Sequence, residues 1–154
     1  SEANLNQVEG IIHSLGLSHS KAMHLIAMAK RIQEKYGGRV PDSYEELLDL
    51  PGVGNKTARV VLMECFHQPA FPVDTHVERV STRLGLVREG LQPAEIEKVL
   101  EKTFPEEEEA LLHHCFIRFG REVCHSRNPE CDHCFLRDYC SFFSAKNTSF
   151  KTGK

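Results

Sequence analysis

Apolar residues recur at helical spacing along most of the chain. Leu5, Val8, Ile11 and Ile12 follow a period of three to four residues, which predicts an amphipathic helix over residues 5–16. No segment shows the period-two alternation of a half-buried strand, so we expect an all-α fold. The same pattern predicts further helices over about residues 20–36, 55–66, 75–85, 93–103 and 107–119.

Capping residues and glycines mark where these helices begin and end. Ser20 precedes an apolar helical run and is expected to be its N-cap, and Gly37 is expected to end the same helix. Ser43 followed three residues later by Glu46 predicts a capping box for a short helix. Residues 51–54, PGVG, then form a tight turn, called the glycine turn below, before the helix over 55–66.

Composition limits what the chain can be. Its 154 residues, 40% hydrophobic, suffice for one core or two small ones. No stretch approaches the roughly 18 apolar residues of a membrane span, and the first ten residues lack the charged and apolar regions of a signal peptide. The net charge of −3 argues against a protein that binds nucleic acid by overall charge, although a local basic footprint remains compatible with it.

The glycine turn stands where an anion could bind. It joins a short helix to the N-terminus of a longer one, in the segment LLDLPGVGNKTARVVL. Gly52 and Gly54 let the backbone approach a phosphate without a Cβ in the way, and the helix dipole favours negative charge at that end. The alternative is a plain corner between two helices, in which Pro and Gly serve geometry alone.

The strongest local pattern is a run of cysteines near the C-terminus. Nothing marks the chain as secreted, so disulfides are not expected. Four close thiolates suit either structural zinc or an iron–sulfur cluster, and ligand chemistry alone leaves both open. Cys65 and Cys115 fall in apolar helical settings and are expected to be buried free thiols. The four cysteines stand in the order C-x6-C-x2-C-x5-C, at Cys124, Cys131, Cys134 and Cys140.

These motifs together resemble one family of repair enzymes. The string LPGVGNKTA, followed eighteen residues after Lys56 by Asp74 in VDTH, resembles the helix-hairpin-helix and aspartate loop of the DNA glycosylase superfamily that carries those features. Lysine at position 56 is similar to the bifunctional endonuclease III branch, whereas the adenine-DNA glycosylase branch has a small hydroxyl residue there and lacks VDTH. The cysteine spacing resembles the 4Fe-4S cluster loop of both branches.

The resemblance covers about residues 8–143 and implies a fold. We expect an all-α helix-hairpin-helix DNA glycosylase fold with a C-terminal iron–sulfur cluster loop, N-terminally truncated because the family's further N-terminal helices are not seen in the sequence. It implies a helical glycosylase domain over 1–118 with the helix-hairpin-helix at about 44–66, a cluster segment over 119–143 that holds the 4Fe-4S cluster, and a flexible tail over 144–154.

The resemblance also assigns the two catalytic roles. Lys56 would be the nucleophile that attacks the sugar C1′ and forms a Schiff base, from which β-elimination expels the 3′ phosphate. Asp74 would activate that nucleophile or stabilise positive charge that develops on the sugar. The simpler interpretation of Asp74 is a helix N-cap, since it directly precedes the predicted helix over 75–85. Both interpretations can hold together.

Further residues are implied to contact DNA. The glycine turn and the first turn of the helix after it would bind a backbone phosphate, with a monovalent cation at the hairpin. Leu17 would wedge into the base stack opposite the expelled base, His76 would be a positioned histidine, and Arg127 would contact a phosphate on the cluster side. For Leu17 the alternative is packing onto its own helix, and for Arg127 a solvated side chain. The full set is Gly52, Val53, Gly54, Thr57, Leu17, His76 and Arg127.

The function implied is that of a bifunctional DNA glycosylase/AP lyase of base-excision repair. We expect it to remove oxidised pyrimidines from double-stranded DNA, to cleave abasic sites, and to act as a monomer in the bacterial cytoplasm, associated with the nucleoid and not with a membrane. Two alternatives are a monofunctional adenine-DNA glycosylase, which would not cut the strand, and a non-catalytic helix-hairpin-helix DNA-binding module, which would need neither Lys56 nor Asp74.

Overall fold

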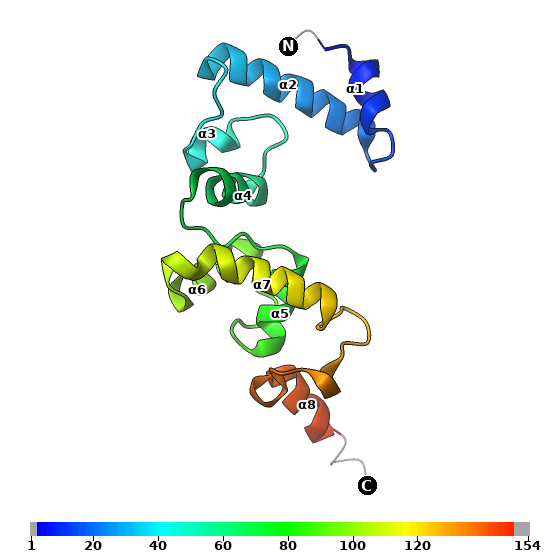
Figure 1. Ribbon diagram of the computed structural model, residues 1–154, viewed down its shortest axis with the longest axis vertical. Coiled ribbons are helices and arrows are strands. Elements are labelled where there is room, and N and C mark those ends of the chain that lie inside the picture. Colours follow the sequence, from blue (N-terminus) through cyan, green and yellow to red (C-terminus); the bar gives the residue numbers. More distant parts are fainter. Residues whose placement is uncertain (1–2, 150–154) are drawn as a thin grey trace. The chain divides into compact units, whose positions relative to one another are not determined.

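The structure, a computed structural model, describes residues 3–149, and every regular element in that range is helical (Figure 1). The prediction of an all-α fold is therefore confirmed. The α-helices are α1 (Leu5–Ile12), α2 (Ser18–Tyr36), α3 (Tyr44–Leu48), α4 (Asn55–Phe66), α5 (Thr75–Leu84), α6 (Pro93–Thr103), α7 (Glu109–Glu122) and α8 (Ser141–Ser149). Three short 3-10 helices are η1 (Glu106–Glu108), η2 (Cys131–His133) and η3 (Arg137–Tyr139).

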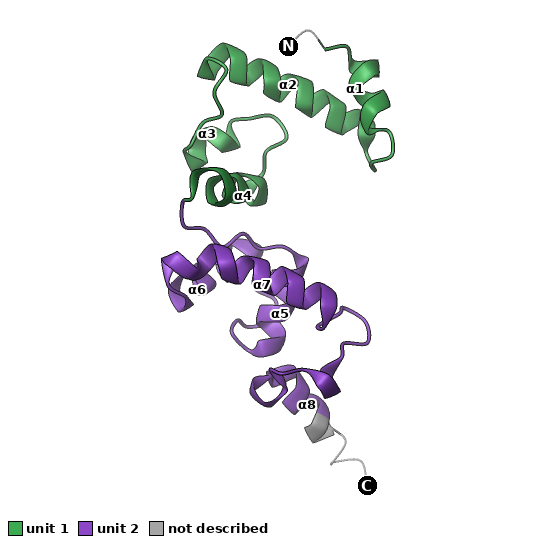
Figure 2. Ribbon diagram, in the orientation of Figure 1, with its two compact units in different colours: residues 1–67 green, residues 68–154 purple. Residues whose placement is uncertain are grey.

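The chain forms two compact units, residues 1–67 and residues 68–154, coloured separately in Figure 2. In the first unit α1 packs against α2, and α3 packs against α4. Its core is small and apolar, and partly buried side chains of α2 such as Met28 and Ile32 cover it. The fully buried residues of this core are Leu47, Leu50, Ala58 and Leu62.

The second unit contains the larger core. Helix α5 packs against α7 and against α8, so the helix that follows Asp74 is covered by two others. Phe71, which is fully buried, lies edge-on to Phe116 and stacks on Phe104, with ring centroids 5.6 and 5.9 Å away. The remaining buried members of this core are Val77, Val80, Val87, Ile96 and Leu100.

Two helix boundaries near the first loop differ from the sequence prediction. The helix that was expected to reach residue 16 ends at Ile12, and Leu17 has φ +61°, in the left-handed region. The N–H of Lys21 donates to the carbonyl of Leu17 at 3.0 Å, which makes Leu17 the N-cap of α2. The expectation that Ser20 caps this helix is therefore wrong.

Helix α8 continues to Ser149, so residues 144–149 of the predicted tail are helical; residues 150–154 lie outside the described range. Two other expectations are wrong. Cys65 and Cys115 are exposed, not buried. Cys65 lies in the last turn of α4, beyond its buried residues, and Cys115 lies off the buried face of α7 that Phe116 marks.

Candidate functional site

The glycine turn is held by a capped helix on one side. Ser43 begins α3: its Oγ accepts the N–H of Glu46 at 3.3 Å and donates to the Glu46 carboxylate at 3.0 Å. The predicted cap at Ser43 is confirmed, with a bond between the two side chains. At the other end of α3 the N–H of Val53 donates to the carbonyl of Leu50 at 3.1 Å, which closes the turn.

The two glycines of the turn differ in how far the structure requires them. Gly52 has φ +80°, and a Cβ added there would lie 2.8 Å from the Cβ of His24, so both the backbone conformation and the packing exclude a side chain. Gly54, the N-cap of α4, has φ −100°, and an added Cβ would meet nothing within 4 Å. The space at Gly54 is open, and no side chain caps the first N–H groups of α4.

Lys56 and Thr57 lie in the exposed first turn of α4, directly after this open position. The opposite face of the helix is buried through Ala58 and Leu62, which fixes α4 to its unit and leaves the Lys56 side chain on the surface. A 12-residue helix concentrates positive potential at its N-terminus. The first unit thus brings a helix start without a side-chain cap and a lysine to one place.

Asp74 lies in the second unit, at the start of α5. Its Oδ1 accepts the backbone N–H groups of His76 and Val77, both at 2.8 Å, so the predicted N-cap is confirmed. Two bonds to one oxygen hold the half-buried carboxylate in a single orientation. His76 is also positioned, because Arg79 Nη2 lies 3.0 Å from its Nδ1.

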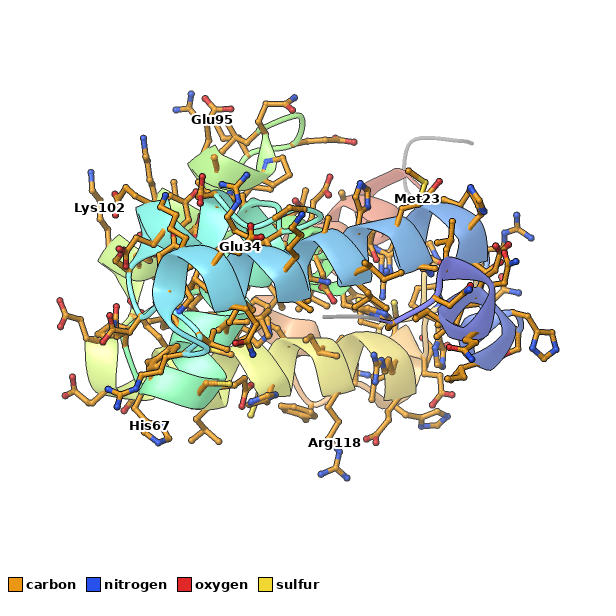
Figure 3. All side chains as sticks on the ribbon, turned by 90° about the horizontal axis from the view of Figure 1, so that it is seen from above. Met23, Glu34, His67, Glu95, Lys102 and Arg118 are labelled. Atoms are coloured by element: carbon orange, nitrogen blue, oxygen red, sulfur yellow. The ribbon has the colours of Figure 1, made fainter. Side chains whose placement is uncertain are left out.

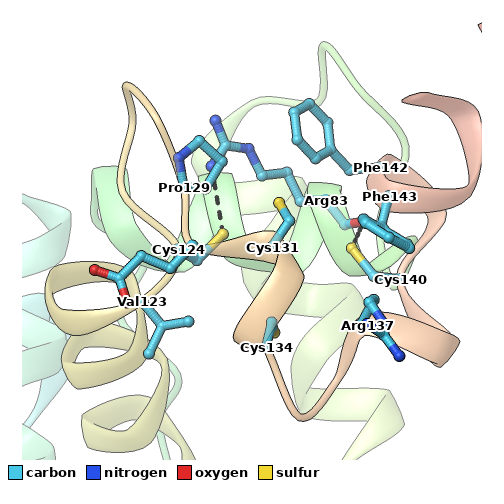
Figure 4. Close-up of a pocket in the computed structure, with 11 residues that line it drawn as sticks. Arg83, Val123, Cys124, Pro129, Cys131, Cys134, Arg137, Cys140, Phe142 and Phe143 are labelled. Carbon is cyan, nitrogen blue, oxygen red and sulfur yellow. Dashed lines mark hydrogen bonds between the residues drawn. The ribbon is translucent and has the colours of Figure 1, made fainter. Parts of the chain in front are cut away.

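The four cysteines of the C-x6-C-x2-C-x5-C run line one cavity of the second unit, together with Arg83 and Phe142 (Figure 4). Burial raises the pKa of the Cys131 thiol. Within residues 3–149, no group of three or more His, Cys, Asp or Glu side chains converges enough to hold one metal ion. Four cysteine thiols around one cavity fit a 4Fe-4S cluster, which takes four thiolates as ligands.

Arginines of α5 tie the cysteine segment to the rest of the unit. Arg83 donates to Cys124 Sγ at 3.3 Å, to the His125 carbonyl at 2.7 Å and to the Ser126 carbonyl at 3.1 Å. Arg79 donates to the carbonyl of Cys124 at 3.0 Å. Sequence reasoning missed both arginines; their spacing of four residues on one helix face was the available signal.

The remaining predicted contact residues are exposed in their own units. Leu17 is 80% exposed, which excludes its packing onto its own helix. Arg127 is exposed in the loop between Cys124 and Cys131, next to Asn128, which has φ +50°. Each side chain is therefore accessible to a ligand, and the roles assigned to them stay predictions.

Comparison with known proteins agrees with this geometry. Residues 1–106 match the HhH-GPD superfamily of base excision DNA repair proteins, and residues 124–140 match the iron–sulfur binding domain of endonuclease III. The fold and the cysteine cavity thus define an iron–sulfur protein of base excision DNA repair, and its cofactor is a 4Fe-4S cluster. Among the residues described, no helix is long and apolar enough to cross a membrane.

Individual relatives identify the family within this superfamily. The chain is 43% identical over 143 residues to endonuclease III of Thermotoga maritima, covering 93% of this chain and 67% of that protein. It is 45% identical over 136 residues to endonuclease III of Bacillus subtilis, covering 88% and 62%. The chain belongs to the endonuclease III family, as predicted, and spans about two thirds of the length of these relatives.

Solved structures give the same result. A trapped endonuclease III–DNA covalent intermediate superposes with a TM-score of 0.90 at 42% identity, covering 94% of this chain and 68% of that chain. A thermostable thymine-DNA glycosylase superposes with a TM-score of 0.85 at 28% identity, covering 94% and 68%. The predicted helix-hairpin-helix glycosylase fold is thereby confirmed.

Proposed function

We propose that this chain carries the active centre of a bifunctional DNA glycosylase/AP lyase of base-excision repair. The observation that supports it most is Lys56 on the surface of the first turn of α4, directly after an open, uncapped glycine position. A related endonuclease III has been captured in a covalent intermediate with DNA, and a lysine amine is the group that forms such an adduct with a sugar aldehyde carbon.

In the proposed reaction Lys56 Nζ attacks C1′ of the damaged nucleotide, and the C1′–base bond breaks as the base leaves with its electron pair and takes up a proton. Opening of the sugar ring gives an imine between Nζ and C1′. Loss of a C2′ proton then expels the 3′ phosphate, and water hydrolyses the imine and frees the amine. None of these steps needs an oxidant or a reductant.

Asp74 would act on the positive charge that builds up at the sugar during this attack. Its fixed orientation supports that role, since two backbone N–H groups at 2.8 Å hold Oδ1 in place. A carboxylate that does not have to reorganise stabilises a developing cation more than a mobile one. The N-cap function and the catalytic function therefore use the same arrangement.

DNA would be held by the contact residues predicted from the sequence. The backbone at Gly52, Val53 and Gly54, with Thr57, would bind one phosphate with the help of a monovalent cation. Exposed Leu17 would fill the gap left by the extruded base. His76 and exposed Arg127 would complete the contacts on the side of the second unit.

Cys124, Cys131, Cys134 and Cys140 would be the four cluster ligands, which their shared cavity supports. When bound, the cluster supplies four iron–thiolate bonds that order a segment too short to have its own core. The protein's own residues extend this order, because Arg83 donates to Cys124 Sγ and to two carbonyls of the same loop. The segment over 119–143 would then present Arg127 in a fixed position.

The substrate class follows from the family: oxidised pyrimidines and abasic sites in double-stranded DNA, handled by a monomer in the bacterial cytoplasm at the nucleoid. The test compares three duplexes, with thymine glycol, an abasic site, or adenine opposite 8-oxoguanine. We expect base release followed by strand cleavage on the thymine glycol duplex, strand cleavage alone on the abasic duplex, and neither on the third. Release of adenine without strand cleavage would favour the monofunctional alternative, and binding without any product would favour the DNA-binding module.

A further inference from the structure

Helix α2 holds the glycine turn through a cluster of polar side chains centred on Asp49, the first residue after α3. Arg31 Nη1 donates to both carboxylate oxygens of Asp49 at 2.8 Å. Lys35 Nζ and the Tyr36 hydroxyl donate to Oδ2 at 3.0 and 3.1 Å. One carboxylate thus receives three donors from a single helix, more than an ordinary surface ion pair provides.

The neighbouring donors favour the charged form of this carboxylate. The hydrogen bond from Lys35 and that from Arg31 lower the pKa of Asp49 from 3.8 to about 2. Asp49 also lies 18 residues from Arg31 in the sequence, so the contact joins two separate segments of the first unit. The ion pair Lys30–Glu34, in contrast, joins neighbouring turns within α2 at 3.7 Å.

A second contact joins α2 to the same turn. The Cβ of His24 lies where a Cβ on Gly52 would come within 2.8 Å, so α2 and the turn are in close approach there. Asp49 and Gly52 flank the start of the turn, and both meet α2. The turn is therefore fixed to α2 at two points, and its orientation depends on that helix.

The same helix begins at Leu17, the predicted wedge. From Leu17 to Arg31 a straight helix rises about 21 Å. In the proposed function Leu17 contacts DNA directly, whereas Arg31 acts through Asp49 next to the turn. A rigid helix between them fixes where the wedge enters the base stack relative to where the turn meets a phosphate. Positioning of this kind affects binding strongly, since small displacements of contacting groups are costly.

We propose that Asp49 and Arg31 form a positioning pair that sets the glycine turn on α2 in the orientation in which it binds a DNA backbone phosphate. This inference rests on the proposed function, because it needs the turn to contact DNA. Neither residue touches the substrate. The pair acts through the turn, so its loss weakens binding of DNA and leaves the chemistry at Lys56 in place.

The test separates binding from chemistry. Binding is titrated with a duplex that carries a tetrahydrofuran abasic analogue, which cannot form a Schiff base. Chemistry is the single-turnover cleavage rate of a true abasic duplex at saturating protein. For Asp49→Asn we expect the Kd to rise about tenfold, with the single-turnover rate within about twofold of the wild type.

Three further variants make the result specific. Arg31→Met should raise the Kd in the same direction but by no more than Asp49→Asn, because Lys35 and Tyr36 still donate to the carboxylate. The double variant should show no larger a rise than Asp49→Asn, since Asp49→Asn already weakens the contact that Arg31→Met removes. Asp49→Glu keeps the charge and should recover part of the affinity. Glu34→Gln removes the ion pair with Lys30 within α2 and should leave the Kd unchanged. Glu34 is labelled in Figure 3.

The outcomes are distinct. All variants are melted by circular dichroism and assayed well below their transitions; if Asp49→Asn does not fold, Arg31→Met and Asp49→Glu carry the test. Unchanged Kd values in folded variants, or Kd increases that add in the double variant, would overturn the pairing. If the wild type itself forms no borohydride-trapped adduct with an abasic duplex, the proposed function fails; if it does and the variants bind normally, only the pairing fails.

Discussion

Removing the Phe71 ring should destabilise the second unit severely. Phe71 is fully buried on the loop that leads to Asp74. Its ring is 5.9 Å from Phe104, 6.1 Å from His113 and 5.6 Å from Phe116, measured between centroids. Phe71→Ala would therefore leave a cavity among three aromatic side chains that belong to other elements and cannot all move in to fill it.

The size of the effect follows from this packing. A buried Phe→Ala change costs about 3–5 kcal/mol in free energy of unfolding, depending on how far the site collapses. Aromatic pairs add about 0.5–1.5 kcal/mol beyond buried area, and Phe71 has three aromatic neighbours. We therefore expect a loss of about 4 kcal/mol, in the middle of the range for such substitutions.

Urea unfolding followed by far-ultraviolet circular dichroism measures this loss. Phe135→Ala is the matched control, since the same atoms are removed from a side chain that is 77% exposed; its loss should be less than about 1 kcal/mol. If both variants lost the same free energy of unfolding, the core of the second unit would not be organised around Phe71 as described.

Three other predictions address the turn, the cysteine loop and the ion pair. Gly52→Ala should lower stability by about 2 kcal/mol, because a left-handed non-glycine residue is strained, whereas Gly54→Ala should change stability by less than about 0.5 kcal/mol and still weaken DNA binding; melting curves and titrations separate the two. Arg83→Met should speed the loss of cluster absorbance to an iron chelator, since it removes the donor to Cys124 Sγ; equal rates would contradict this. The pKa of Asp49 is lowered from 3.8 to about 2, so the stability advantage of the wild type over Asp49→Asn should be complete above pH 3.8 and disappear as the pH falls through 2, in acid titrations of both proteins.

Local patterns were sufficient to predict most of the helices. Periodicity placed the helix over 55–66 correctly, and Ser43 and Asp74 were recognised as caps because their bonds reach only two or three residues along the chain. The first loop was predicted less well. A left-handed Leu17 has no local signal, since leucine rarely adopts that conformation, and Ser20 offered a plausible but wrong helix start.

Contacts between distant segments could not be read from the sequence. Arg83 and Cys124 are 41 residues apart, and Arg31 and Asp49 are 18 apart. Nothing local to any of these residues specifies its partner. The exposure of Cys115 was missed for a related reason. Its apolar sequence neighbours suggested burial, but Cys115 lies on the side of α7 that faces solvent.

In the proposed function Lys56 forms the covalent bond to DNA, and this bond can be located directly. The protein is incubated with an abasic duplex and borohydride, the reduced adduct is digested, and the modified peptide is identified by mass spectrometry. We expect the sugar mass to be attached to Lys56 and Lys56→Ala to abolish the adduct. Lys30→Ala, which removes a surface lysine of α2 in the same unit, should leave the adduct in place. An adduct on another amine of the wild type, or an undiminished adduct in Lys56→Ala, would contradict the proposed role of Lys56.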